Sequence, residues 1–315
     1  MIQTVTGAIS KTDFGAVLMH EHISCSSLSF YNAFGKAWLD KEQLKNLASE
    51  TLKQTKQKFN LSFMVDATPI DLGRDLMLLK EVSELSGVKI VASTGFYYLQ
   101  SIEAFNNSPQ ELANWLIYEC ANGVGDTHIK PGILKCATGG VGITDDNFNK
   151  LVTMAIVQKE TGLPLYVHCE HNEDIAFKQL DVLLKNGATP EKIIIGHTAI
   201  RPDAEYLESI LKMGCYICMD QCHCYPHNKA VIAETLVKLC QKGYTDKILL
   251  ANDYCIHSDF CNEKTNGLHL SPAQHTDGLG YVLDLVYKEF IAMGGDDIAW
   301  ETMICKNAMD ILDTE

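Results

Sequence analysis

The sequence lacks the features that mark exported, membrane-spanning and nucleic-acid-binding proteins. Its first residues are not the basic and apolar regions of a signal peptide, and no apolar run approaches the ~18 residues that span a bilayer. Basic residues are few, with 26 Lys and Arg against 40 Asp and Glu and a formal net charge of -14. This charge argues against nucleic acid or an anionic membrane surface as a partner. The charge says nothing positive about the substrate, which we expect to be a small molecule.

The chain also shows no linker, low-complexity tract or internal repeat, so we expect one domain over residues 1–315. Twelve cysteines without an export signal indicate free thiols in a reducing, cytoplasmic compartment rather than a disulfide framework. The apolar fraction of 46% and the charged fraction of 21% are typical of a soluble globular protein.

Eight short runs rich in Val, Ile and Leu recur along the chain, as strands of a buried parallel sheet do. They cover residues 16–22, 63–67, 89–93, 132–137, 163–169, 192–197, 215–219 and 247–253. Amphipathic stretches predict helices near 41–58, 73–86, 109–121, 146–160, 173–186, 203–213, 229–242, 279–293 and 298–311. Eight strand–helix alternations predict a (β/α)8 TIM barrel with a short N-terminal cap and a C-terminal helix. An open doubly wound sheet is the alternative, but no Gly-rich phosphate turn follows the first strand.

Two histidines follow the first apolar run. Side chains alternate along a strand, so His20 and His22 point the same way and Glu21 points the opposite way. Two imidazoles side by side form half of a transition-metal site. The plain alternative is a pair of polar residues where a strand leaves the core.

Polar residues also stand at the ends of other predicted strands, where the chemistry of such barrels collects. They are Lys135 on the fourth strand, His168 on the fifth, His197 on the sixth and Asp253 on the eighth. Imidazoles and carboxylates can bind metal ions, whereas an ammonium cannot because it has no lone pair. Lys135 could extend out of the barrel or pair with an acid. It could also react with carbon dioxide and form a carbamate that bridges two metal ions ~3.5–4 Å apart.

Several motifs in this order resemble the phosphotriesterase family of the amidohydrolase superfamily over nearly the whole chain. They are Met19-His20-Glu21-His22, Val65-Asp66-Ala67-Thr68, Asp71-Leu72-Gly73-Arg74-Asp75, Ala92-Ser93-Thr94-Gly95, Gly132-Ile133-Leu134-Lys135, Val167-His168, Ile195-Gly196-His197-Thr198, Asn252-Asp253 and Lys306-Asn307-Ala308. The resemblance implies a hydrolase that uses a hydroxide activated by two divalent metal ions.

Carried over by residue, the resemblance implies that His20, His22 and Asp253 bind the more buried ion. His168 and His197 would bind the more exposed ion, and Lys135 matches the carboxylated lysine that bridges the two. The family's ions are usually Zn²⁺, with Co²⁺, Mn²⁺ or Fe²⁺ in some members. Asp253 would also receive the proton of the hydroxide. Family members are often homodimers, and we expect the same here by analogy.

Departures from the family pattern bear on the substrate. Ile200 and Gln221 stand where organophosphate-degrading members have the Asp and His of an outward proton relay. Tyr97 resembles the tyrosine that lactonases of the family place at the third strand end, and it is a candidate catalytic residue. Ile256 replaces the basic residue of members that act on phosphorylated lactones, although Lys264 or Arg201 could substitute. Lactone or carboxyl-ester hydrolysis is therefore favoured over phosphotriester or amide hydrolysis, and a non-catalytic metal-binding barrel is a further alternative.

Other side chains have plain interpretations. Spacing within a strand sends Cys215 and Cys218 to opposite faces, so a thiolate cluster with Cys222 and Cys224 is not favoured over apolar filling. Long connections over 23–40 and 254–277 are candidate lids of the barrel mouth. The aromatic residues of the first connection are interpreted as loop packing, with a hydrophobic lid wall as the alternative; they are Phe30, Tyr31, Phe34 and Trp38. The histidines of the loops after the seventh strand (His223, His227) and the eighth strand (His257, His269, His275) are interpreted as solvated, and His257 or His223 could replace the missing relay.

Overall fold

The computed structural model describes residues 1–11, 14–100, 106–172, 174–222, 229–259, 264–265, 268–269 and 278–314. Within them, a nine-stranded sheet has neighbouring strands in the order β10-β9-β8-β7-β6-β5-β4-β3-β11. Every neighbouring pair in it is parallel. The strands are β3 (Ala16–Cys25), β4 (Leu61–Asp66), β5 (Lys89–Gly95), β6 (Ile133–Ala137), β7 (Leu165–His168), β8 (Ile193–Ile195), β9 (Tyr216–Met219), β10 (Ile248–Leu250) and β11 (Tyr254–Ser258). All eight predicted runs overlap one of these strands.

The two ends of this sheet are successive segments of one stretch of chain. β10 pairs with β9, and β11, which follows it after three residues, pairs with β3. The sheet therefore curls back on itself, and the predicted TIM barrel is confirmed. The single eighth strand expected over 247–253 is wrong in detail, because Asp253 adopts a left-handed backbone with φ 57° and interrupts the ladder.

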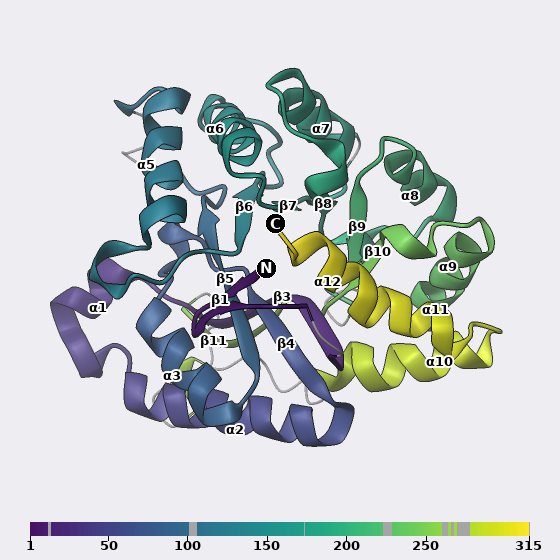
Figure 1. Ribbon diagram of the computed structural model, residues 1–315, viewed down its shortest axis with the longest axis horizontal. Coiled ribbons are helices and arrows are strands. Elements are labelled where there is room, and N and C mark those ends of the chain that lie inside the picture. Colours follow the sequence, from purple (N-terminus) through teal and green to yellow (C-terminus); the bar gives the residue numbers. More distant parts are fainter. Residues whose placement is uncertain are drawn as a thin grey trace.

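Helices surround the barrel in the order of the chain (Figure 1). They are α2 (Lys41–Phe59), α3 (Leu76–Ser86), α5 (Pro109–Asn122), α6 (Asp145–Thr161), α7 (Ile175–Lys185), α8 (Ala204–Leu211), α9 (Lys229–Gln241), α10 (Tyr287–Ala292), α11 (Asp297–Glu301) and α12 (Asn307–Leu312). Side chains of Asp40, Asp75 and Thr144 accept hydrogen bonds from the first turns of α2, α3 and α6, as N-cap residues do. Each predicted helical stretch overlaps at least one of these helices. The last two stretches also include π-helical turns over Tyr281–Val286 and Thr302–Lys306.

The sequence predicts an N-terminal cap and two long connections as candidate lids, and the structure describes the second of these connections only in part. β1 (Ile2–Thr4) and β2 (Gly7–Ile9) form an antiparallel hairpin, which is the expected N-terminal cap. The connection after β3 contains a helix that the sequence did not predict, α1 (Leu28–Phe34). Phe30 packs against Trp38 with ring centroids 4.9 Å apart, although Phe30 is still half exposed. The connection after β11 is described only over β12 (Lys264–Thr265) and β13 (Leu268–His269).

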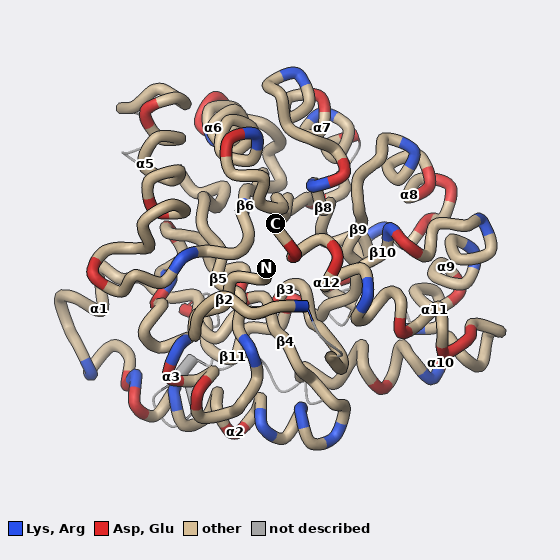
Figure 2. The backbone as a smooth tube through the Cα atoms, in the orientation of Figure 1, with Lys and Arg blue, Asp and Glu red and all other residues tan. Residues whose placement is uncertain are grey.

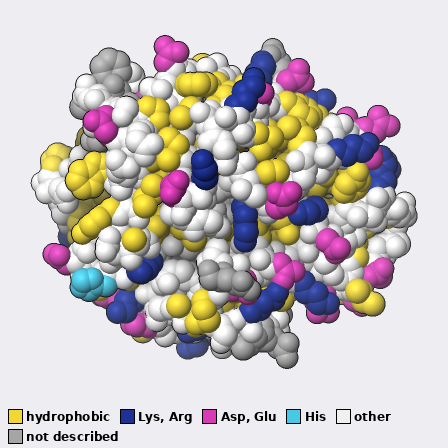
Figure 3. Space-filling view, turned by 45° about the horizontal axis from the view of Figure 1, so that its top comes forward, with side chains coloured by type: hydrophobic (Ala, Val, Ile, Leu, Met, Phe, Trp, Pro, Cys, Tyr) yellow, Lys and Arg dark blue, Asp and Glu magenta, His cyan; other side chains and the backbone are white. Residues whose placement is uncertain are grey.

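Charged side chains lie on the outer helices rather than in one block. Figure 2 shows lysine, arginine, aspartate and glutamate spread along α2, α7, α8 and α9. On the face seen in Figure 3, acidic and basic side chains are interspersed with apolar ones. Among the described residues, no helix combines the length and the apolar character needed to cross a membrane.

Glu21 closes the barrel where the eighth strand is interrupted. Its buried carboxylate accepts hydrogen bonds from the backbone N of Asn252 at 2.7 Å, the Asn252 side chain at 3.0 Å and the backbone N of Tyr254 at 2.7 Å. These bonds replace ladder bonds that β10 and β11 lose at the break. The outward direction predicted for Glu21, opposite to His20 and His22, is what makes this possible.

We predict that Glu21→Ala lowers the free energy of unfolding by about 3 kcal/mol or more, because three buried donors lose their acceptor at ~1–3 kcal/mol each. Glu21→Gln keeps one carbonyl acceptor and should cost less. The measurement is urea unfolding, with Glu84→Gln on the exposed face of α3 as the control. A Glu21→Ala protein as stable as this control would contradict the closing role.

Candidate metal centre

The six residues predicted as metal ligands meet at the carboxyl ends of the strands. His20 and His22 come from β3, Lys135 from β6 and His168 from the end of β7. His197 follows β8, and Asp253 lies in the break between β10 and β11. Five of the six are buried, and the side chain of Asp253 keeps 15% of its surface exposed.

Three donor atoms form one half of the centre. The Nε2 atoms of His20 and His22 are 3.2 Å apart, and Oδ1 of Asp253 lies 3.3 and 3.1 Å from them, respectively. These three side chains offer ligand atoms close enough to hold one metal ion. Lys135 joins this group, since its Nζ is 3.0 Å from Nε2 of His20.

Two more imidazoles form the other half. Nε2 of His197 is 2.6 Å from Nδ1 of His168, and their rings meet edge to face with centroids 4.1 Å apart. The His197 ring stacks on that of His20 with centroids 5.1 Å apart, so the two halves are adjacent. His197 has a left-handed backbone with φ 60°, an uncommon conformation for a residue with a side chain. Such conformations cluster at functional sites.

A buried carboxylate orients the histidines from behind. Oδ2 of Asp220, which follows β9, accepts a hydrogen bond from Nδ1 of His20 at 2.6 Å. Its Oδ1 accepts from Nδ1 of His197 at 3.2 Å, and the hydroxyl of Tyr166 also donates to this carboxylate. Nδ1 of His22 contacts the Thr68 hydroxyl at 2.8 Å. Protons held on the Nδ1 atoms of His20 and His197 leave the Nε2 lone pairs facing the centre.

The sequence interpretation did not assign this role to Asp220. A signal was present, because Asp220 is a carboxylate at the end of the seventh strand, beside the strand ends already occupied by candidate ligands. Periodicity places the residue but does not say which imidazoles it meets.

Burial lowers the pKa of His20 and of His168 to about 3, and it also lowers the pKa of Lys135. Burial lowers the pKa of His22 as well, but the neighbouring Cys25 and Asp253 outweigh it and raise this pKa well above the usual value. Burial acts in the opposite direction on Asp253, but the neighbouring His20 and His22 hold the pKa of its carboxyl well below the usual value. Imidazole nitrogens face each other at 3.2 Å between His20 and His22 and at 2.6 Å between His168 and His197, and two lone pairs at such distances repel unless a cation or a proton lies between them. The residues present therefore fit a pair of divalent cations.

Tyr97 and Gln221 border this group. The Tyr97 ring lies edge to face against His168 with centroids 5.3 Å apart, and burial raises the pKa of its hydroxyl far above the usual value. Nε2 of Gln221 donates to Oδ2 of Asp253 at 2.7 Å. The backbone of Tyr97 is held by Asp71, which accepts from its N at 2.8 Å, and by the buried Lys150, which donates to its O at 3.0 Å.

The other residues weighed from the sequence lie elsewhere or are not described. His257 contacts the Ser24 hydroxyl at 3.0 Å and lies 3.8 Å from Asp259. Arg201 stacks over the Tyr206 ring at 3.9 Å, and Ile256 is buried. Cys215 donates to the carbonyl of Ile210. Some residues considered in the sequence analysis lie outside the part of the chain that the structure describes: His223, Cys224, His227 and His275, and the side chains of Lys264 and His269.

A cavity of about 680 Å³ is lined by Cys25, which neighbours His22, and by Asp71, which binds the backbone of Tyr97. The described part of its lining includes none of the six predicted metal ligands. As far as the structure describes it, the lining includes the carboxylates of Asp71 and Asp259 and contains neither lysine nor arginine. Three serines and the side chains of Phe96 and Leu99 complete a surface that is mostly apolar with a few polar groups. Such a composition is typical of a small-molecule site.

Comparison with known proteins identifies the family. A sequence model of the Phosphotriesterase family matches residues 1–292. The chain belongs to this family. An aryldialkylphosphatase of Saccharolobus solfataricus is 30% identical over 262 residues, which cover 82% of each chain. The solved structure of the phosphotriesterase from Mycobacterium tuberculosis matches with a TM-score of 0.88 at 25% identity, and the match covers 99% of this chain and 98% of that one.

The relatives of this phosphotriesterase-family hydrolase act on more than one kind of bond. Besides the aryldialkylphosphatase, an N-acetyltaurine hydrolase of Rattus norvegicus is 27% identical over 301 residues, which cover 80% of this chain and 83% of the relative. The resemblance seen in the sequence motifs is thus confirmed at the level of family and hydrolase class.

We predict that Asp220→Asn lowers the affinity for divalent metal about 10–100-fold, because the amide cannot accept from both imidazoles. Zinc affinity is measured by competition with a chromophoric chelator. The matched control is Asp246→Asn, an acid on the surface turn before β10. Equal affinities for Asp220→Asn and wild type would mean that Asp220 does not orient the ligands.

Proposed function

We propose that the chain is a two-metal hydrolase of lactones or related carboxyl esters. The observation that carries this choice is the 2.7 Å hydrogen bond from the Gln221 amide to Oδ2 of Asp253. A carboxamide holds Asp253 in place but passes no proton onward at neutral pH. Ile200 lies on the turn after His197 and offers no titratable group either. At these two described positions, therefore, no group is present that could relay the proton outward as phosphotriester hydrolysis would require.

The proposed ligand sets follow the two halves of the centre. His20, His22 and Asp253 would hold one ion, His168 and His197 the second, and a carboxylated Lys135 would bridge them. Zn²⁺ is the proposed metal, with Co²⁺, Mn²⁺ or Fe²⁺ as alternatives, because imidazole and carboxylate suit all four. When bound, two such ions lower the pKa of a water and polarise a substrate oxygen.

Asp253 and Tyr97 are the proposed catalytic residues. Asp253 faces the open mouth and takes up the proton of the attacking water, which it then returns to the leaving alkoxide. In a lactone this alkoxide stays attached to the product, so the proton need not leave the site. Tyr97 remains protonated because burial raises the pKa of its hydroxyl, and it can donate a hydrogen bond to a substrate oxygen.

The cavity supports an uncharged substrate. Asp71 and Asp259 bring negative charge to its lining, and the described part has no basic residue to pair with a phosphate or sulfonate. A neutral aliphatic lactone fits this surface better than a phosphorylated sugar lactone. By analogy with the family we also infer a homodimer.

Phosphotriester hydrolysis is the second candidate, favoured by the 30% identity to an aryldialkylphosphatase. Amide hydrolysis is suggested by the N-acetyltaurine hydrolases, but N-acetyltaurine is an anion. The same donor set can serve all three reactions, so the choice depends on the leaving group and the pocket. A barrel that binds metal without catalysis would leave all three activities absent from metal-loaded protein.

The test compares kcat/KM on aliphatic γ- and δ-lactones, an activated phosphotriester and N-acetyltaurine. We expect the lactones to be turned over best, and Gln221→His to raise phosphotriester turnover relative to lactone turnover. A wild-type phosphotriester preference of ~100-fold, about 2.7 kcal/mol in transition-state binding, would overturn the lactonase choice.

Lys135→Ala should lose much of the bound metal and the activity, because the bridging group is removed. Short carboxylic acids should partly restore both by occupying the place of the carbamate. Elemental analysis and lactone turnover, each with and without added acetate or propionate, measure the effect. Full metal content and full rate in Lys135→Met would show that the lysine is not a ligand.

A further inference from the structure

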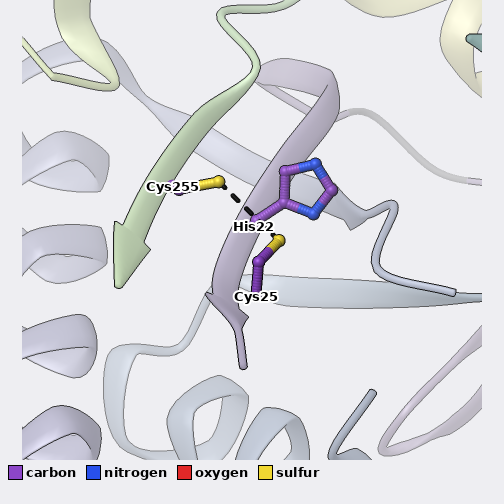
Figure 4. A group of neighbouring side chains, drawn as sticks. All are labelled: His22, Cys25 and Cys255. Carbon is purple, nitrogen blue, oxygen red and sulfur yellow. Dashed lines mark hydrogen bonds between the residues drawn. The ribbon is translucent and has the colours of Figure 1, made fainter. Parts of the chain in front are cut away.

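Two cysteine side chains lie together beside the histidines of the centre. Cys25 is the last residue of β3, Cys255 is the second residue of β11, and their Sγ atoms are 3.8 Å apart. Figure 4 shows the two sulfurs on neighbouring strands, turned toward each other next to the His22 imidazole. One ligand atom from each of the three side chains lies within 4.8 Å of the other two.

The distance between the sulfurs matches the geometry of a shared metal ion. Two thiolates bound at ~2.3 Å to one tetrahedral zinc ion lie ~3.8 Å apart. Cys25 and Cys255 can therefore take one ion between them with little movement of either strand. We propose that Cys25, Cys255 and His22 form a binding site for a soft divalent ion such as Zn²⁺ or Cd²⁺, which lies beside the centre proposed above and shares His22 with it.

Cysteine thiolates prefer such ions over the harder Mg²⁺, Ca²⁺ and Mn²⁺. Other buried cysteines of the described chain make a different kind of contact. Sγ of Cys215 donates to the carbonyl of Ile210, and Sγ of Cys222 donates to the carbonyl of Met219. Cys25 and Cys255 instead face each other, with a third donor close by.

An ion can reach the pair from solvent. Cys25 lines the 680 Å³ cavity, and Cys255 is only half-buried. Binding replaces the two S–H bonds by two metal–sulfur bonds, and the two protons pass to water in the cavity. With His22 as the third ligand, a water completes the tetrahedron.

His22 gives this site a consequence for the main centre. Its Nε2 lies 3.1 Å from Asp253 and its Nδ1 lies 2.8 Å from the Thr68 hydroxyl. A soft ion that takes His22 removes a ligand from the proposed buried ion, so the two sites compete for one imidazole. Binding by the thiols themselves does not depend on the substrate class proposed above.

The test titrates the purified, metal-containing protein with Cd²⁺ and follows the ultraviolet charge-transfer band of cadmium thiolates. Cadmium that replaces an ion among histidines and carboxylates gives no such band. In wild type, we expect the band to reach its full absorbance after about one equivalent of Cd²⁺ per chain. The band should be lost to the same extent in Cys25→Ser, in Cys255→Ser and in the double variant. Cys215→Ser, which alters a buried cysteine outside the site, is the matched control and should keep the band.

A band of wild-type size in Cys25→Ser and Cys255→Ser would overturn the proposal, and so would an equal loss in Cys215→Ser. Circular dichroism checks that each variant is folded. If a serine variant does not fold, X-ray absorption of cadmium bound to the wild-type protein decides instead. Two sulfur neighbours support the site, and a shell of nitrogen and oxygen alone overturns it.

Discussion

The buried carboxylate of Asp220 is the contact on which the geometry of the centre depends. It accepts hydrogen bonds from His20 on β3, Tyr166 on β7 and His197 after β8, while Asp220 itself follows β9. Hydrogen bonds to this one carboxylate thus connect residues on or next to four strands of the barrel, on the side of the imidazoles away from the candidate metal centre. Loss of one partner would leave a buried charge or a buried donor unpaired, which is costly in a low-dielectric interior.

The interruption of the eighth strand links barrel closure to chemistry. On one face of β3, the Glu21 side chain accepts hydrogen bonds from the backbone N atoms of Asn252 and Tyr254 at the break. On the other face, His20 and His22 face Asp253. The backbone N of Asp253 still donates to the carbonyl of His20 at 2.9 Å. Its left-handed backbone places the carboxylate beside two imidazoles, with 15% of the side chain exposed. Local strain of this kind is tolerated because the surrounding contacts over-determine it.

A second group of contacts holds Asp253 and Tyr97, the two residues proposed to be catalytic. Gln221 holds the oxygen of Asp253 that does not face the histidines, and Asp71 and Lys150 hold the backbone of Tyr97 from opposite sides. These contacts are distinct from the donors that would bind metal. A change of leaving group or substrate charge can therefore be accommodated by loop residues on an unchanged metal centre, as the different activities in the names of the relatives suggest.

The sequence by itself determined the strand–helix alternation, since continuous apolar runs and amphipathic helical stretches are both visible in it. It also placed His20, His22, Lys135, His168, His197 and Asp253 at strand ends, because the end of an apolar run is visible in the sequence. The hydrogen bonds of Asp220, the break at Asp253, the contact of Gln221 and the meeting of Cys25 with Cys255 came only from the tertiary structure. These depend on which side chains distant strands bring together when the barrel closes, and periodicity along one strand carries no information about its neighbours across the sheet.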